Sequence, residues 1–220
     1  MSQFANARRT MLDNQIRTAD VTELRLLAAL GEVPRERFVP ADLRPLAYTD
    51  HVLRLTDGAP GRWLMTGATL GKLIQLAEIA PKDKVLVVGS GSGYSVAVIA
   101  PLAAGVVGLE EDDALVASST EVLASLGIAN ASIAKGGLTA GHAAAAPYDV
   151  IFIEGAIDDV PAALSSQLAE GGRLIAVEGR GGSAVARVYL KSAGVVTGRT
   201  AFNCVAKPLP GFERKPEFVF

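Results

Sequence analysis

Three glycines at alternate positions follow directly on a run of apolar residues in the segment VLVVGSGSGYS. The loop that they form consists of Gly89, Ser90, Gly91, Ser92 and Gly93. Glycine allows positive φ and close approach of the backbone to a ligand, and each serine hydroxyl can donate and accept a hydrogen bond. Because nucleotide-like ligands are held where a buried strand turns into a helix, we take this loop as a candidate ligand-binding loop.

The residues after the third glycine discriminate among nucleotide ligands. A P-loop requires Lys followed by Ser or Thr, whereas Tyr94 and Ser95 stand here. The dinucleotide fingerprint requires a small residue at its sixth position, which is Tyr94, so NAD or FAD is a poor second choice. The remaining G-x-G-x-G pattern is the one associated with S-adenosylmethionine, which carries no pyrophosphate. A tight strand-to-helix turn that binds no ligand is the structural alternative.

An acidic residue ends the next apolar run, GVVGLE, at Glu110. A carboxylate at this strand end can accept hydrogen bonds from both ribose hydroxyls of a nucleoside. We therefore predict that Glu110 binds the ribose of the cofactor. The acids that follow it, residues 111–113, are explained equally well by the preference for negative charge in the first turn of a helix.

The elements that position these residues form an alternating pattern from Lys84 onward. Short, nearly continuous apolar runs alternate with helix-like or loop segments, and the runs are KVLVV, GVVGLE, NASIAK, YDVIFIE and GGRLIAVE. Strands buried on both faces are typical of a parallel sheet covered on each side. AVARVYLKS and TGRTAFNCVAK, joined by a glycine turn, indicate an antiparallel pair at one edge. Residues 11–17, 21–30, 42–47 and 66–79 have features of helices.

We therefore predict an α/β fold, a Rossmann-like three-layer sandwich with a mostly parallel sheet, an antiparallel C-terminal strand pair and an N-terminal helical cap. The 220 residues suffice for one domain with a substantial core. Within that domain we expect residues 1–62 to form the helical cap and substrate loop, and residues 63–220 to form the cofactor-binding core.

Composition argues against several classes of partner. A net charge of −2 gives no general attraction to nucleic acid. No apolar run reaches the roughly 20 residues of a membrane-spanning helix, and the N-terminus does not have the pattern of a secretory signal, so we expect a cytoplasmic protein. With one cysteine, Cys204, and two histidines, His51 and His142, we expect no structural metal.

Several longer segments together resemble one family, the protein-L-isoaspartate O-methyltransferases, over nearly the whole chain. The matching segments are MLDNQIRT, LAALGEVPRERFVP, LAYTDHVL, LAEIAPKDKVLVVGSGSGYSVAVIA, APYDVIFIEGA and LAEGGRLIAVEG. The N-terminal segments are the most specific, because generic methyltransferases do not share them. The resemblance implies S-adenosyl-L-methionine as cofactor. It also implies methylation of the carboxylate of altered, isoaspartyl residues in a protein or peptide partner, a repair reaction.

The chain departs from the family in the loop before the first core helix. The family carries Gln-Thr-Ile-Ser-Gln-Pro there, and its serine lies near the transferred methyl and orients the substrate carboxylate. Matching without gaps places Met65 at the serine, with Leu64 before it and Thr66 after it. The resemblance thus implies that these three residues line the methyl-transfer side, with Met65 and Thr66 at the catalytic positions. A thioether donates no hydrogen bond, so only Thr66 offers a hydroxyl.

A second departure lies in NASIAKGG, where Gly136 stands in place of the aspartate that holds the adenine amino group in the family. Loss of one charge-assisted hydrogen bond costs roughly 1.5–3 kcal/mol, so the remaining contacts can still give useful binding. We keep Gly136 in the cofactor site. Two alternatives therefore stay open: a methyltransferase with a different acceptor, and a non-catalytic protein that binds S-adenosylmethionine.

Other residues near the site have both a functional and a structural interpretation. We expect Arg62 to be an exposed loop arginine rather than a partner of the substrate carboxylate. Trp63 suits equally a pocket wall and a hydrophobic anchor, and His51 is expected to be structural. Glu154 ends the fourth apolar run, at the sheet edge where ligands bind, and is a weaker candidate for facing the methyl group. We expect the C-terminal segment PGFERKPEFVF to dock on the core.

Overall fold

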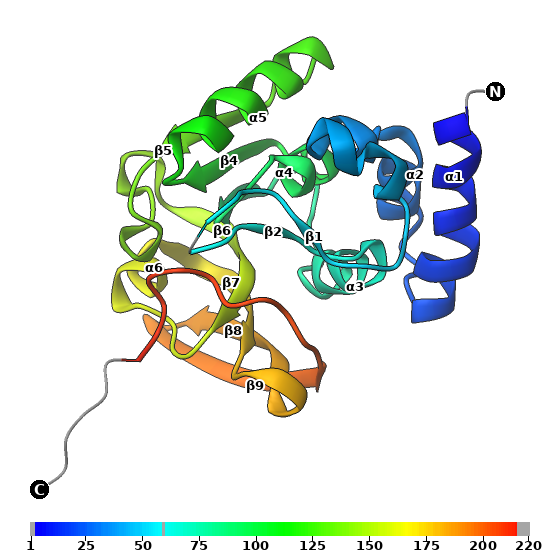
Figure 1. Ribbon diagram of the computed structural model, residues 1–220. Helices are drawn as coiled ribbons and strands as arrows, with labels where there is room; N and C mark the ends of the chain where they lie inside the picture. Colours follow the sequence, from blue (N-terminus) through cyan, green and yellow to red (C-terminus); the bar gives the residue numbers. More distant parts are fainter. Residues whose placement is uncertain (1–2, 59, 215–220) are drawn as a thin grey trace, which may run out of the picture.

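The computed structural model describes residues 3–58 and 60–214, and within them the chain forms one seven-stranded sheet of order β5-β4-β3-β6-β7-β8-β9 (Figure 1). The first five strands of this order are parallel and the last two are antiparallel. The strands are β3 (Lys84–Val88), β4 (Gly105–Glu110), β5 (Ala131–Lys135), β6 (Tyr148–Ile157), β7 (Leu168–Glu178), β8 (Val185–Ser192) and β9 (Val195–Asn203). The predicted fold class is confirmed.

The helices and a small hairpin complete the described part of the chain. The hairpin pairs β1 (Leu53–Arg54) with β2 (Trp63–Leu64). The α-helices are α1 (Gln3–Met11), α2 (Leu24–Glu32), α3 (Gly67–Leu76), α4 (Tyr94–Ile99), α5 (Asp113–Ser125) and α6 (Ala162–Ser166). A π-helix (Leu12–Ile16) extends α1, and short 3-10 helices occupy Arg17–Ala19, Arg35–Phe38, Ala41–Leu46, Ala100–Leu102, Leu138–Ala140, Ala143–Ala145 and Gly181–Ser183. No helix among these residues is long and apolar enough to cross a membrane.

Successive side chains along each buried strand point to opposite faces of the sheet, so the core consists of two apolar clusters. Val85 and Val87 of β3 belong to the cluster that packs against α2, α3 and α4, whereas Leu86 and Val88 belong to the cluster on the opposite face. Several α-helices cover the first face (Figure 1). In the described residues the second face is covered by α6, 3-10 turns and the C-terminal segment. The alanine-rich stretch before β6 forms 3-10 turns because it lacks the apolar spacing that buries a helix face.

The beginnings of the helices have local causes. Asp112 accepts a hydrogen bond from the Leu115 amide at 3.0 Å and caps α5, and Thr66 caps α3 by accepting from the Thr69 amide at 3.2 Å. At α2 the cap is Glu23, whose carboxylate accepts amide hydrogen bonds from the first turn. The caps therefore fix where the loops before α3 and α5 end.

A buried arginine fixes the N-terminal segment against the core. Arg35 is fully buried, and its Nε donates to the Ala47 carbonyl at 2.7 Å. Its Nη2 donates to the carbonyl of Met65, and its guanidinium lies 4.7 Å from the ring centroid of Tyr94. Burial lowers the pKa of Arg35, while the surrounding polar groups oppose that change. Arg35 thereby ties the segment before β1 to the loop that enters α3.

We predict that Arg35→Met lowers the free energy of unfolding by about 2–4 kcal/mol, because two buried carbonyls lose their charged donor. Arg37→Met is the matched control, since Arg37 is exposed and bonds only the Ser125 hydroxyl at 2.7 Å among the contacts recorded for its side chain. Urea unfolding monitored by circular dichroism measures both. Equal midpoints for the two variants would show that Arg35 does not stabilise the fold.

Candidate functional site

Three residues of neighbouring strands meet at one edge of the sheet: Gly89 follows β3, Glu110 ends β4, and Glu154 lies in the last part of β6. β3 lies between β4 and β6, and the chain crosses over β3 to reach β6, which makes this position the topological switch point. The registers of the two pairings place Gly89, Glu110 and Glu154 at the same level along the strands. Ligands of open α/β sheets bind at such a crevice, outside the carboxyl ends of the strands.

The glycine loop has the backbone that its sequence predicts. Gly89, Gly91 and Gly93 have φ values of +75°, +53° and +84°, in the left-handed region that side chains disfavour. A Cβ atom on Gly89 would lie 2.6 Å from Leu209 Cδ1, and one on Gly93 would lie 2.9 Å from Ser119 Cβ. The loop therefore requires glycine both for its conformation and for the closeness of its neighbours.

The two serines of the loop are buried and point to different sides. Ser90 packs against Gly108 of β4, where a Cβ atom would lie 2.9 Å from the Ser90 Oγ. Ser92 lines a separate cavity of about 180 Å³ that Phe38 and Leu115 also border. Neither hydroxyl has a hydrogen-bond partner within residues 3–58 and 60–214. Buried hydroxyls normally have partners, so both are available to a ligand or a bound water.

Glu110 is completely buried and its carboxylate accepts four hydrogen bonds. Oε2 accepts from the Gly91 amide at 2.8 Å and from Arg62 Nη2 at 2.7 Å. Oε1 accepts from the amides of Glu111 at 2.9 Å and Asp112 at 3.2 Å. A carboxylate offers about four lone-pair sites, so the chain itself occupies the acceptor capacity that was predicted for the ribose.

The position of Arg62 corrects the sequence-based expectation. This arginine was expected to be exposed, but it is only 5% exposed and forms a buried ion pair with Glu110. It reaches the carboxylate because the β1–β2 hairpin lies over the carboxyl edge of the sheet, a placement that local sequence patterns do not encode.

The C-terminal segment after β9 covers the same loop. The Lys207 carbonyl accepts from the Ala156 amide at 2.9 Å, and the Leu209 amide donates to the Ala156 carbonyl at 2.8 Å. We call residues 205–212 the C-terminal strap. Leu209 and Phe212 are buried. Burial of Phe212 agrees with the docking expected for the segment PGFERKPEFVF, whose residues 215–220 lie outside the described residues. Leu209 packs directly on Gly89 and Gly155.

A cavity of about 20 Å³ lies between the hairpin, the start of α3 and the strap, which is room for one water molecule. Its lining includes Arg62, Trp63, Met65, Thr66, Glu154 and Leu209. Trp63 is flanked by two cations, with Arg54 at 5.4 Å and Lys207 at 4.7 Å from its ring. Trp63 is therefore a wall of the cavity and also a contact between hairpin and strap.

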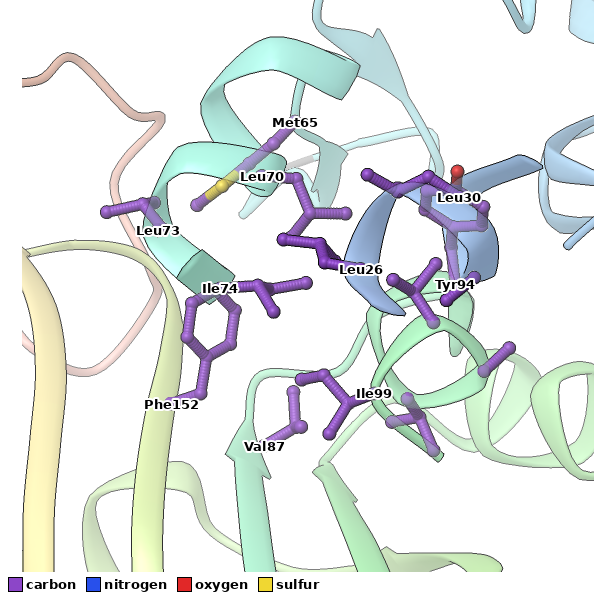
Figure 2. Packing of buried hydrophobic residues seen from close by; sticks show 14 of the residues in the cluster. Leu26, Leu30, Met65, Leu70, Leu73, Ile74, Val87, Tyr94, Ile99 and Phe152 are labelled. Atoms are coloured by element: carbon purple, nitrogen blue, oxygen red, sulfur yellow. The ribbon is translucent and has the colours of Figure 1, made fainter. Parts of the chain in front are cut away.

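The residues predicted to lie on the methyl-transfer side divide between the cavity and the core. Met65 borders the cavity, but its side chain also packs beside Leu70 and Leu73 at the edge of the apolar cluster (Figure 2). Thr66 borders the cavity, and its hydroxyl accepts from the Thr69 amide at 3.2 Å and donates to the Thr69 hydroxyl at 3.0 Å. Leu64 is 1% exposed and belongs to the core cluster, so its side chain lies away from the cavity lining.

Gly136 lies immediately after β5, and its amide donates to the Glu110 carbonyl at 3.0 Å. A Cβ atom there would lie 3.1 Å from Leu109 Cδ1. The structure thus places Gly136 next to Glu110. His51 is exposed, which contradicts its expected structural role, and no cluster that could hold a metal ion exists among the described residues.

Glu154, the weaker candidate of the sequence analysis, is a buried acid. It is 7% exposed, borders the cavity and accepts a hydrogen bond from the Ser95 hydroxyl. Burial raises the pKa of Glu154 to about 8, although Ser95, Arg62 and Arg35 act to lower it. The group is therefore mostly protonated at neutral pH. The available signal was its position at the end of the apolar run YDVIFIE, although β6 itself continues beyond that run to Ile157.

The residue types of this edge fit a nucleoside ligand, whereas the space between them is filled. The glycine loop, the strand-end acid and two unpartnered hydroxyls are suitable binding groups. In this arrangement, however, Arg62 occupies Glu110 and Leu209 covers Gly89. A ligand that contacts both the Gly89 backbone and the Glu110 carboxylate therefore requires both side chains to move.

The fold and the site define a doubly wound α/β protein with a nucleoside-type site at its switch point. The family model for Protein-L-isoaspartate(D-aspartate) O-methyltransferase matches residues 6–212. A protein-L-isoaspartate O-methyltransferase of Koribacter versatilis (strain Ellin345) is 37% identical over 211 residues, covering 96% of this chain and 94% of the relative. The chain belongs to this family.

A further relative agrees with this assignment, and solved structures share the fold. Protein-L-isoaspartate O-methyltransferase 2 of Anaeromyxobacter sp. (strain Fw109-5) is 38% identical over 172 residues, covering 78% of this chain and 70% of that one. A solved protein-L-isoaspartate O-methyltransferase superposes with a TM-score of 0.80 at 24% identity, covering 93% of this chain and 66% of that one.

A putative enzyme of the same name from Plasmodium falciparum, solved in complex with S-adenosyl-L-homocysteine, gives a TM-score of 0.75 at 19% identity, covering 95% of this chain and 99% of that one. At these identities the two solved structures support the fold.

We predict that Glu154→Gln makes stability less dependent on pH. A carboxyl group whose pKa rises on folding binds more protons in the native state, so wild-type stability falls as pH rises from about 5 to about 8. Glutamine cannot ionise, so the free energy of unfolding of Glu154→Gln should rise relative to that of wild type across this window, by on the order of 2–4 kcal/mol. Urea titrations at several pH values measure it, with the exposed Glu121→Gln as control. Parallel pH profiles for wild type and Glu154→Gln would contradict the prediction.

Proposed function

We propose that this protein is an S-adenosyl-L-methionine-dependent carboxyl O-methyltransferase that acts on isoaspartyl residues in proteins or peptides. The observation that carries the proposal is the family match over residues 6–212 combined with a glycine loop and a strand-end acid at the switch point of the sheet. The cofactor supplies an electrophilic methyl group on a sulfonium. The chain has to bind the two reactants and align them.

The cofactor half of the site uses backbone and small residues. Gly89, Gly91 and Gly93 let the backbone approach the ligand, and the unpartnered hydroxyls of Ser90 and Ser92 are available for hydrogen bonds. Glu110 is the ribose acceptor in this proposal, and Gly136 beside it belongs to the adenine side. Since the buried carboxylate already accepts four hydrogen bonds, ribose binding requires that one donor leaves.

The acceptor half needs orientation more than acid–base chemistry. A substrate carboxylate is ionised at neutral pH and needs no general base, so the rate depends on alignment of its oxygen with the methyl group. Met65 cannot donate a hydrogen bond. Among the donors that line the cavity, we assign the Thr66 hydroxyl and the protonated carboxyl of Glu154 to orientation of the acceptor.

The direct test is transfer of labelled methyl from S-adenosylmethionine to a peptide that contains one isoaspartyl residue. The matched control peptide has the same sequence with a normal aspartyl residue. Base-labile methyl ester on the isoaspartyl peptide alone is the expected result. Binding of S-adenosylhomocysteine without any ester would reject the proposed acceptor and favour another acceptor or a non-catalytic role.

We predict that Thr66→Val lowers kcat/KM for the isoaspartyl peptide by roughly 10- to 100-fold, because one oriented donor is lost. Thr66→Ser keeps the hydroxyl and should remain within about threefold of wild type. Both variants are compared at a temperature well below unfolding, because loss of the α3 cap costs about 1 kcal/mol of stability. Equal activity of the valine and serine variants would remove Thr66 from the acceptor site.

A further inference from the structure

We propose that Arg62 is a built-in competitor of the cofactor, which holds the ribose-binding carboxylate of Glu110 until the hairpin and the C-terminal strap open. This inference rests on the proposed function, because it names a second state of that same site. In the closed state the guanidinium replaces the sugar hydroxyls as hydrogen-bond donor. Cofactor binding then requires exchange of an ion pair for the ribose contacts.

The first support is the burial of the pair. The side chains of Arg62 and Glu110 are 6% and 0% exposed, and their closest atoms are 2.7 Å apart. Solvent screens such a pair poorly, so the arginine is a strong competitor at this position. Its Nε has no hydrogen-bond partner within the described part of the chain. The guanidinium is therefore incompletely satisfied, which limits the cost of releasing it to water.

The second support is that Glu110 does not need Arg62. Three backbone amides, those of Gly91, Glu111 and Asp112, still donate to the carboxylate when the guanidinium leaves. Backbone donors at a strand end suffice to hold a buried carboxylate in its charged form. The pair is thus not required to satisfy the acid, and an exchange of Arg62 for a ribose leaves no buried charge without partners.

The third support is that hairpin and strap close over one point. A Cβ atom built on Gly89 would lie 3.0 Å from Arg62 Nη2 and 2.6 Å from Leu209 Cδ1, so the two side chains meet above the same glycine. Trp63, the neighbour of Arg62, contacts Lys207 of the strap. Release of Arg62 and displacement of Leu209 are therefore coupled through adjoining residues.

If the site alternates between these states, the measured affinity for the cofactor equals the intrinsic affinity reduced by the fraction of open molecules. Removal of the competing guanidinium raises that fraction. A residue that merely shapes the binding site would act in the opposite direction, because its loss weakens binding. The sign of the change in affinity therefore separates the two roles.

The experiment is calorimetric titration of the full chain with S-adenosylhomocysteine. We expect Arg62→Ala to lower Kd by about tenfold or more relative to wild type. Arg62→Met is the second variant, because methionine fills the buried volume if the alanine variant is unstable. Arg54→Ala is the matched control, since Arg54 lies on the same hairpin and contacts Trp63 without reaching Glu110, and its Kd should equal that of wild type.

The outcomes separate the inference from the proposed function. Tighter binding by both Arg62 variants, with Arg54→Ala unchanged, supports the competitor role. If wild type binds the ligand and the Kd of the Arg62 variants is equal to or higher than that of wild type, the competitor role is overturned and the proposed function stays intact. No binding by any of the four proteins rejects the proposed cofactor and the competition with it. Emission of Trp63, the sole tryptophan, provides an independent record of opening during the titration.

Discussion

The buried carboxylate of Glu110 is the constraint on which the site depends. A charge inside the protein must be fully hydrogen-bonded, and this one draws its donors from the glycine loop, the segment leading into α5 and the β1–β2 hairpin. The position of each of these segments at the sheet edge is therefore linked to a single side chain. Because the loop amide of Gly91 is one of the donors, the conformation of the loop and the position of the acid support each other.

The two halves of the site differ in how they are built. The cofactor half consists of backbone geometry and one acid, and it retains the features that the family resemblance implies, apart from Gly136. The proposed acceptor half consists of side chains from the hairpin, the start of α3 and the strap, and it includes the thioether of Met65. Arg35 contributes from a distance, because it binds the Met65 carbonyl and so fixes the loop that carries the acceptor residues. Glu154 adds a protonated acid beside them.

Arg62 and Leu209 cover the site in one arrangement, and ligand binding requires a second arrangement in which both side chains have moved. The closed arrangement buries an ion pair and an apolar side chain over the glycine loop, and the open arrangement exchanges these contacts for those of a ligand. Glu110 retains three backbone donors in both arrangements, so its buried carboxylate stays hydrogen-bonded throughout the exchange.

The order of residues was enough to predict the alternating α/β pattern, the antiparallel edge, the glycine loop and the position of Glu110 at a strand end. These features follow from local chemistry, namely apolar periodicity, the freedom of glycine and the short distance along the chain between loop and acid. Only the tertiary structure decided that Arg62 is buried against Glu110, that Leu209 covers Gly89 and that Glu154 is a buried acid. Each of these contacts joins residues far apart in the chain, and each depends on how the hairpin and the strap fold back over the sheet, which the local pattern of residues does not specify.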